Sequence, residues 1–307
     1  MENFVTSGAG VLFIALTGVC AAQVGADTAV AQEPEHISDL PYVEMPHPEQ
    51  HLDFFWPAAG ARSTVVFLHG GGLSASGERR SSPMYRHICE PFVARSIACA
   101  SADYRLAPDF RWPAMAQDVA AAVAEVRGLV RVRGGDPDRL FLFGHSSGCT
   151  LAAVVATDPS HLNAIGLAPS DLAGAVLMGC VLDNYDAALR RLTADAIREA
   201  FARSRSDVER FGTPENWLSA NPSFFVGPHV PPTLVVVARE ERFFPAILEQ
   251  GARFVRRLLE ADVAADLVVV PGTHRSSVEG IPQPGDPALA AIVAFLEDPT
   301  ADGRGGP

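Results

Sequence analysis

Residues 144–148 (GHSSG) carry the clearest chemical signature in the sequence. They follow a short apolar run at 140–143 (LFLF) and precede a helix-forming stretch at 149–157 (CTLAAVVAT). Between a strand and a helix, a G-x-S-x-G turn pushes the serine hydroxyl out above the sheet, where it can act as a nucleophile. A glycine-bearing flexible turn is the alternative. The flanking elements favour Ser146 as a catalytic nucleophile.

A glycine run at 69–72 (HGGG) follows another apolar run, TVVFL. Acyl transfer needs N–H donors arranged around the carbonyl oxygen as it becomes an oxyanion, and glycines let the backbone come close enough to supply them. We expect the N–H groups of Gly71 and Gly72 to be such donors, with Gly70 shaping the turn. The backbone amide of Ser147, directly after the nucleophile, is the further donor expected.

A phosphate-binding loop is the rival interpretation of these glycines. No Lys-Ser or Lys-Thr pair follows them and no G-x-G-x-x-G pattern is present, so this interpretation is disfavoured. We expect His69 to anchor the loop rather than to act as a base. The acyl-transfer chemistry requires neither a metal ion nor an organic cofactor.

The base and the acid should follow the nucleophile in the chain order Ser, acid, His. His274 lies after the last apolar run, in a loop at the carboxyl end of an expected strand, and is the predicted base. His161 follows the helix behind the nucleophile and His229 precedes a strand, so neither is well placed. These positions predict that His274 takes the proton of Ser146 and returns it to the leaving group.

Two adjacent carboxylates follow the run TLVVV, again at the carboxyl end of an expected strand. One could orient the imidazole while the other faces solvent or a neighbouring arginine. We choose Glu241 as the triad acid, with Glu240 as the runner-up and a surface charge run as the alternative. In this scheme Glu241 fixes the imidazole tautomer and stabilises its cationic form, and water releases the acyl-enzyme.

Short β-branched runs alternate with segments of helical period, the pattern of a parallel sheet covered on both faces. The strand-like runs lie at 64–68, 97–100, 140–143, 175–178, 234–237 and 267–270. The helical segments lie at 84–95, 112–130, 247–259 and 287–296. The sequence therefore predicts an α/β fold.

The remaining segments define the expected domain organisation. Residues 42–56 predict a hairpin, and the polar residues before it, 32–39, are expected to be loose. Residues 184–230 have no strand-like run but have charged helical stretches, which predicts a small helical cap over the carboxyl ends of the strands. One hydrolase domain at 32–298 and a disordered tail at 299–307 are expected.

Composition narrows the classes of partner. The chain has 307 residues, 48% of them hydrophobic, which is ample for the core of one large α/β domain. Its formal net charge is −12 and no basic cluster is present, so a nucleic-acid partner is disfavoured.

Residues 1–31 are interpreted as a signal peptide or an N-terminal anchor. Residues 11–22 are apolar but too few for a comfortable membrane span, and 29–31 (AVA) has the pattern of a cleavage site. No Lys or Arg stands before the apolar stretch, so an uncleaved anchor or a mispredicted start stays open. We expect a secreted or periplasmic protein without a stable membrane span. A cytoplasmic or N-terminally membrane-anchored protein is the alternative.

The spacing of the cysteines does not indicate a disulfide framework. Cys20 would leave with the leader, and the other four are irregularly spaced, with no C-x-x-C pair: Cys89, Cys99, Cys149 and Cys180. We expect these four to be buried free thiols that act as small hydrophobes, with neither a disulfide framework nor a zinc site.

With these motifs in place, the chain resembles the hormone-sensitive-lipase-like branch of the α/β-hydrolase esterases and lipases, and their arylformamidase-like relatives. The resemblance covers about residues 42–296. Besides HGGG and GHSSG, it includes DYRLAP at 103–108, Pro113-Ala114 with Asp118, and PPT at 231–233. It implies an α/β-hydrolase fold: a mostly parallel eight-stranded sheet flanked by helices, with a small helical cap insertion.

The resemblance also implies roles for particular residues. In such enzymes the DYRLAP segment supports the oxyanion loop, so Asp103 and Arg105 are expected to be structural. The family usually places Gly-x-x-Asp after its seventh strand, whereas this chain has AREE at 238–241, so that Glu241 stands in the acid position with a longer arm.

The combined motifs predict a serine carboxylic-ester hydrolase that acts on small to medium acyl esters. An arylformamidase-like amide hydrolase is the first alternative, because the segment 42–54 resembles that subgroup equally well. A non-catalytic binding protein on the same fold is the second alternative. It is disfavoured because all three triad positions are filled.

Overall fold

The computed structural model describes residues 33–182, 193–242 and 246–300. The expected leader at 1–31, the start of the expected cap and most of the expected tail lie outside these ranges. By its contacts the chain divides into two units, Met1–Ala31 and Gln32–Pro307, and all described residues belong to the second. Among the described residues, no helix is long and apolar enough to cross a membrane.

The core of this unit is an eight-stranded sheet with the order β1-β2-β4-β3-β5-β6-β7-β8. The first two strands pair antiparallel, β2 also pairs antiparallel with β4, and every other pair is parallel. The strands are β1 Glu35–Pro41, β2 His51–Trp56, β3 Ser63–Leu68, β4 Ile97–Ala102, β5 Leu140–His145, β6 Gly174–Met178, β7 Thr233–Ala238 and β8 Ala265–Val270. The predicted mostly parallel eight-stranded sheet is confirmed.

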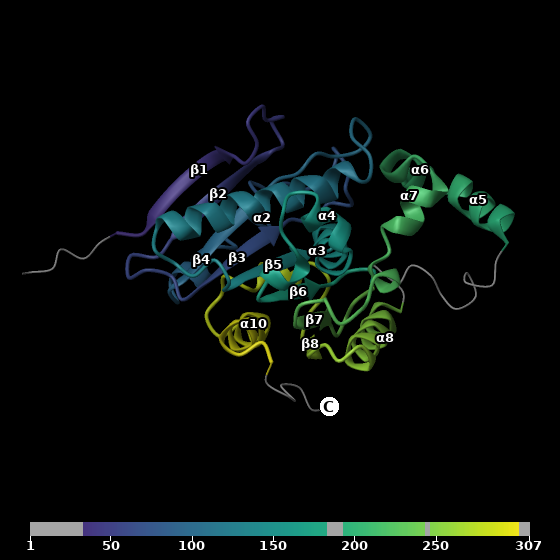
Figure 1. Ribbon diagram of the computed structural model, residues 1–307. Helices are drawn as coiled ribbons and strands as arrows, with labels where there is room; N and C mark the ends of the chain where they lie inside the picture. Colours follow the sequence, from purple (N-terminus) through teal and green to yellow (C-terminus); the bar gives the residue numbers. More distant parts are fainter. Residues whose placement is uncertain (1–32, 183–192, 243–245, 301–307) are drawn as a thin grey trace, which may run out of the picture. The chain divides into compact units, whose positions relative to one another are not determined.

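Helices cover both faces of this sheet (Figure 1). They are α1 Glu90–Val93, α2 Ala114–Val132, α3 Ser147–Thr157, α4 Pro159–Asn163, α5 Ala194–Arg203, α6 Arg205–Phe211, α7 Pro214–Ser219, α8 Ile247–Glu260, α9 Ser276–Glu279 and α10 Pro287–Glu297. Alternate residues of β3 enter two separate cores, because successive side chains of a strand point to opposite faces. Val66 and Leu68 belong to the core that also contains residues of α2, α3 and α8, whereas Val65 and Phe67 belong to the core that also contains residues of α1 and α10.

The predicted insertion between β6 and β7 consists mainly of short helices over its described residues, 193–230. It holds α5, α6 and α7, which are short helices that each begin at a hydroxyl-bearing N-cap residue: Thr193, Ser204 and Thr213. Each cap side chain accepts a hydrogen bond from a backbone N–H of the first turn, which satisfies a donor that a helix start otherwise leaves unpaired.

The expectation that residues 32–39 are loose is wrong. Residues Glu35–Pro41 form β1, which pairs with β2 at the edge of the sheet. The polar composition reflects the exposed position of an edge strand, since five of its seven residues face solvent. The hairpin predicted at 42–56 therefore begins earlier than expected, with strands β1 and β2, and in the connection between them the N–H of Gln50 donates to the carbonyl of His47.

The expectation of four free thiols is also wrong. The cysteines are buried, as predicted, but they are paired as Cys89–Cys99 and Cys149–Cys180, with Cα–Cα distances of 5.4 and 5.5 Å. The first disulfide joins the residue before α1 to β4, and the second joins the first turn of α3 to the segment directly after β6. The spacing of the cysteines along the sequence could not reveal either pair, because each disulfide forms only where a helix packs beside a neighbouring strand of the folded sheet.

Candidate active site

Ser146 lies at a sharp turn between β5 and α3. Its φ angle is 55°, a conformation that costs a non-glycine residue free energy and recurs at functional sites. The turn is closely packed: a Cβ atom on Gly144 would lie 2.2 Å from the Gly148 carbonyl oxygen, and one on Gly148 would lie 2.3 Å from that of His69. The two glycines of the motif are therefore required by space.

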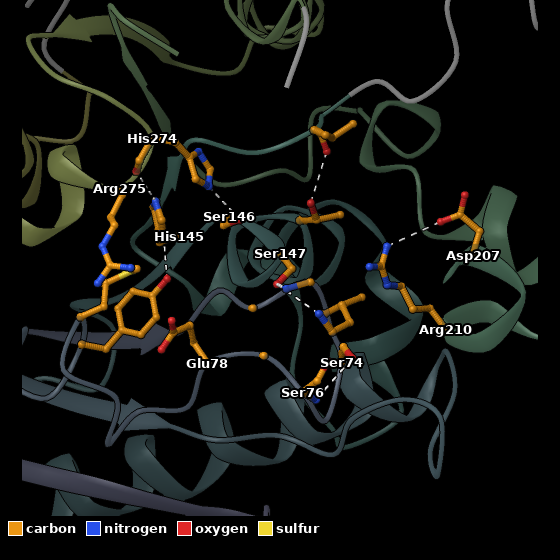
Figure 2. Close-up of a pocket in the computed structure, with 18 of the residues that line it drawn as sticks. Ser74, Ser76, Glu78, His145, Ser146, Ser147, Asp207, Arg210, His274 and Arg275 are labelled. Carbon is orange, nitrogen blue, oxygen red and sulfur yellow. Dashed lines mark hydrogen bonds and ion pairs between the residues drawn. The ribbon is translucent and has the colours of Figure 1, made fainter. Parts of the chain in front are cut away.

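A continuous hydrogen-bond chain joins three side chains from three separate loops. His274 Nε2 lies 3.0 Å from Ser146 Oγ, and His274 Nδ1 lies 2.7 Å from Glu241 Oε2 (Figure 2 shows the first contact). A carboxylate only accepts, so Nδ1 carries the proton and Nε2 is free to accept from the serine hydroxyl. The geometry suits proton transfer from Ser146 to His274.

The two adjacent glutamates occupy different environments. The Glu241 side chain is only 4% exposed and faces the imidazole, whereas Glu240 is exposed to solvent. The other two candidate histidines are engaged elsewhere: His161 lies 3.7 Å from Asp158, and His229 Nε2 lies 2.7 Å from the carbonyl of Thr157.

The glycine loop lies directly against the residue after the nucleophile. The N–H of Gly72 donates to Ser147 Oγ at 2.8 Å, and the N–H of Leu73 approaches the same oxygen at 3.3 Å. The expectation that the Gly72 N–H is an oxyanion donor is therefore wrong, because the Ser147 hydroxyl already accepts it. Within the part of the chain that the structure describes, the N–H groups of Gly71 and Ser147 donate to no protein acceptor. The side chain of Ser147, which the sequence did not single out, thus holds the loop.

Buried polar contacts on the side away from the pocket support the glycine loop. The His69 ring stacks on the ring of Tyr104 at 4.4 Å, and the Tyr104 hydroxyl donates to the His69 carbonyl at 2.7 Å. Asp103 accepts from the backbone N–H of Arg80 at 2.8 Å and pairs with its guanidinium. Burial raises the pKa of Asp103, but His69 and Arg80 lower it by a larger amount. The net pKa therefore lies below the usual value. These contacts place Asp103 among structural supports.

Arg105 belongs to a second buried group behind the loop. Its guanidinium binds both carboxylate oxygens of Asp118, at 2.7 and 2.8 Å, and Gln50 donates to the same carboxylate at 2.7 Å. The group ties the segment after β4 to α2 and to the hairpin. The contacts of Arg105 therefore stabilise the fold, in agreement with the structural role expected for it.

Two further buried residues near the triad were not predicted. Tyr85 Oη lies 2.7 Å from His145 Nδ1, and His145 Nε2 lies 3.0 Å from the carbonyl oxygen of His274. The pKa of His145 is lowered to about 3, mainly by burial and to a lesser extent by the nearby His274. His145 stands inside the GHSSG motif itself, so its place in the motif was the available signal.

These residues open on a pocket of about 1040 Å³ (Figure 2). Ser146, His274 and the glycine loop form one side. The cap contributes both charged and aromatic side chains to the lining: Asp207, Arg210, Phe211 and Trp217. The guanidinium of Arg210 lies over Gly72, where a Cβ atom would be 3.2 Å from its Nη2. The insertion therefore helps to enclose the reacting serine.

Several curated proteins are similar in sequence. Ethyl acetate hydrolase from Pseudomonas putida is 26% identical over 282 residues, which cover 87% of this chain and 84% of that protein. Esterase LipQ from Mycobacterium tuberculosis is 27% identical over 248 residues, which cover 78% of this chain and 56% of that protein. This chain thus spans only a little over half the length of LipQ.

Solved structures share the fold. Esterase B from Lactobacillus Rhamnosis superposes with a TM-score of 0.67 at 20% identity, over 90% of this chain and 89% of that one. An esterase from the archaeon Pyrobaculum calidifontis superposes with a TM-score of 0.64 at 24% identity, over 86% and 82% of the two chains. The sequence model of the α/β hydrolase fold family matches residues 65–276. Because this match covers more than half of the sequence, the chain belongs to the α/β hydrolase fold family.

Proposed function

We propose that the protein is a serine carboxylesterase with the triad Ser146, His274 and Glu241. The observation that carries this proposal is the hydrogen-bond chain from the serine hydroxyl through the imidazole to a buried carboxylate, on the wall of a large pocket. The esterase names of the relatives are consistent with it.

The reaction has two halves. Ser146 Oγ attacks the ester carbonyl carbon while His274 Nε2 takes its proton, and His274 then protonates the leaving alcohol as the C–O bond breaks. In the second half, water gives a proton to His274 as its oxygen attacks the acyl carbon. The bond from that carbon to Ser146 Oγ then breaks, His274 returns the proton to Oγ, and the acid is released. Glu241 accepts from Nδ1 throughout and stabilises the cationic imidazole.

We assign the oxyanion donors to the N–H groups of Gly71 and Ser147, with the neighbouring Gly72 held in place by the Ser147 hydroxyl. Removing one such donor typically lowers the rate by about 10²–10³-fold. The start of α3 lies directly behind Ser146, and its positive end favours the developing negative charge.

Small to medium acyl esters are the proposed substrates. The pocket volume of about 1040 Å³ accommodates such a molecule, and Phe211 and Trp217 supply apolar surface for an acyl or alcohol group. We propose no nucleic-acid partner, in keeping with the net charge of −12.

The test compares wild type with Ser146→Ala on p-nitrophenyl acetate, butyrate and octanoate and on an N-formyl aryl amide. We expect the wild type to prefer the short esters, and the variant to lose about 10⁴-fold or more in kcat/KM because the nucleophile is absent. Ser76→Ala is the matched control, since Ser76 lines the same pocket without contacting the triad.

The outcomes separate the alternatives. A wild type that turns over the formamide faster than every ester would replace the esterase assignment with an amide hydrolase. Equal rates for wild type and Ser146→Ala would defeat the proposed Ser146 mechanism, and rates no higher than the uncatalysed reaction for both proteins would leave a binding protein as the remaining interpretation.

We further infer export, with cleavage of the leader after Ala31. The two disulfides of the hydrolase domain support this inference, because disulfides persist in secreted and periplasmic compartments and are rare in a reducing cytosol. N-terminal sequencing of protein recovered outside the cytoplasm is expected to begin at Gln32. Recovery only from the cytoplasm with Met1 retained would contradict export.

A further inference from the structure

Two buried side chains beside the triad take no part in the proton transfers proposed above. Tyr85 lies in the loop before α1, and His145 is the last residue of β5; each residue is 1% exposed. A hydroxyl and an imidazole are costly to bury unless hydrogen bonds replace their lost water. We call Tyr85 and His145 the buried pair.

The contacts of the buried pair determine where its protons lie. His145 Nε2 is 3.0 Å from the carbonyl oxygen of His274, which can only accept, so Nε2 carries a proton. The imidazole is neutral, because burial lowers its pKa to about 3, and Nδ1 is therefore an acceptor. The Tyr85 hydroxyl donates to it at 2.7 Å. Every polar atom of the His145 ring is satisfied in a single tautomer.

One end of the buried pair holds the loop that carries the base. The His274 carbonyl accepts from His145 Nε2 and also from the Ser277 hydroxyl at 3.1 Å. The rings of His145 and His274 lie 4.7 Å apart (Figure 2). Glu241 thus orients the imidazole of His274, while His145 holds its backbone.

The other end of the buried pair lies against the oxyanion loop. The Tyr85 hydroxyl is so close to Gly70 that a Cβ atom there would lie 2.6 Å from Oη. The Tyr85 ring packs against Phe67 at 5.5 Å and lies 6.3 Å from the ring of His69. Tyr85 therefore contacts the glycine loop with its hydroxyl and the strand before it with its ring.

We propose that Tyr85 and His145 are positioning residues that set the loop of His274 relative to Ser146 and the oxyanion loop. This proposal rests on the esterase function proposed above. Ser146 directly follows His145, so a hydrogen bond from His145 to the His274 backbone fixes the nucleophile and the base with respect to each other. Tyr85 extends the same frame to Gly70. A small displacement at this point misaligns the donor and acceptor of the proton transfer but leaves substrate binding in the pocket largely unchanged.

Three variants test the proposal, assayed as kcat and KM per active site titrated with a phosphonate. An Asn side chain reaches the position of Nδ1 but not that of Nε2, whereas Gln reaches the position of Nε2. We expect His145→Asn to lose about 30-fold in kcat with KM within about threefold, and His145→Gln to recover most of that loss. Tyr85→Phe should lose about fivefold in kcat by the same reasoning.

A stability control separates positioning from folding. Thr157→Val removes another buried hydroxyl, which donates to the Ala153 carbonyl at 2.8 Å at the far end of α3. It should lower Tm comparably while leaving kcat within twofold of wild type, about the scatter expected away from the site. His145→Asn and Tyr85→Phe with wild-type kcat per titrated site would overturn the proposal.

Including Ser146→Ala keeps the two proposals distinguishable. If that variant is inactive while His145→Asn turns over at the wild-type rate, the esterase function stands and only the positioning role fails. If Ser146→Ala is as active as wild type, the esterase proposal itself fails.

Discussion

At the scale of single residues, the site depends on which of two neighbours turns inward. Glu240 and Glu241 follow β7 one after the other, yet one is exposed and the other is buried against His274. A buried carboxylate facing an imidazole N–H stabilises the positive charge that forms when His274 accepts a proton. The longer arm of Glu, compared with the Asp usual in this position, still reaches Nδ1 at 2.7 Å.

This contrast predicts unequal effects of the same substitution. Glu241→Gln is expected to lower kcat by about 10²–10⁴-fold, because an amide cannot hold the imidazole in the required tautomer as a carboxylate does. Glu240→Gln, which makes the identical chemical change one residue away, should stay within about threefold of wild type, as exposed substitutions usually do. Steady-state kinetics on p-nitrophenyl butyrate measures both. A larger loss from Glu240→Gln would reverse the assignment of the acid.

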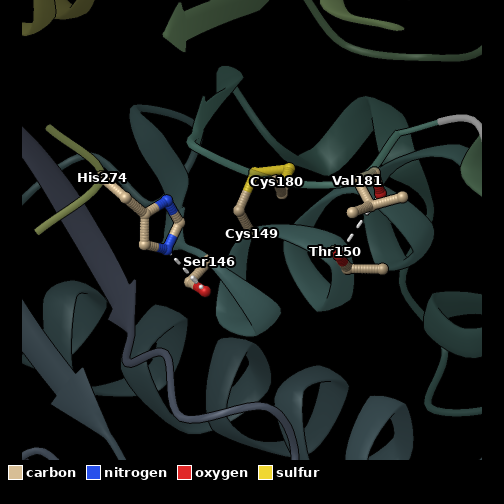
Figure 3. Close-up of a disulfide and its surroundings, with 6 residues drawn as sticks. All are labelled: Ser146, Cys149, Thr150, Cys180, Val181 and His274. Atoms are coloured by element: carbon tan, nitrogen blue, oxygen red, sulfur yellow. Dashed lines mark hydrogen bonds between the residues drawn. A yellow bond between two sulfur atoms is a disulfide. The ribbon is translucent and has the colours of Figure 1, made fainter. Parts of the chain in front are cut away.

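At the scale of elements, the helix behind the nucleophile is cross-linked to the neighbouring strand. Cys149 lies in the first turn of α3, and its disulfide partner Cys180 follows β6 (Figure 3). Beside the bond, the Thr150 hydroxyl donates to the Val181 carbonyl at 3.4 Å, and both residues line the pocket. The disulfide therefore holds the segment directly after β6 against the first turn of the helix that follows the nucleophile.

Removing this cross-link should affect both stability and activity. The double variant Cys149→Ala/Cys180→Ala is expected to lose about 3–4 kcal/mol in unfolding free energy, since the bond closes a loop with a sequence separation of 31. It should also lose severalfold in kcat. Cys89→Ala/Cys99→Ala, with a separation of 10, should lose about 2–3 kcal/mol and keep its kcat. Urea denaturation and ester assays measure these effects, and equal kcat values for both pairs would contradict the role given to Cys149–Cys180.

At the scale of the whole molecule, stability depends on keeping a neutral imidazole in the core. His145 is buried between Tyr85 and His274, and its pKa falls from 6.5 to about 3 on folding. The unfolded chain therefore binds a proton at this residue at a pH where the folded protein does not. Above pH 6.5 this linkage is absent. As the pH falls from 6.5 towards 3, protonation increasingly favours the unfolded state.

The linkage predicts a measurable pH dependence. Between pH 6 and pH 3.5, His145 should make the unfolding free energy fall by up to about 1.4 kcal/mol more for each unit by which the pH is lowered. His145→Gln has no ionisable group there and should show a correspondingly shallower profile. Urea denaturation across this range gives both profiles. Parallel profiles would show that His145 carries no such linkage.

The sequence by itself determined the residues that carry local signals. A strand–turn–helix with GHSSG identifies the position of Ser146, and a glycine run after a strand identifies the loop at 69–72, because both features depend on neighbours in the chain. Apolar runs of four or five residues identified every parallel strand for the same reason. The position of His274 followed from the shared edge at which parallel strands end.

Only the tertiary structure decided how distant segments meet. The choice of Glu241 over Glu240, the pairing of four cysteines and the contact of Tyr85 with His145 each join residues that sequence spacing does not relate. The strand at 35–41 was missed because an exposed edge strand needs no apolar pattern; its backbone pairing with β2 defines it. Such contacts arise from strand order and register, which bring side chains together irrespective of their separation along the chain.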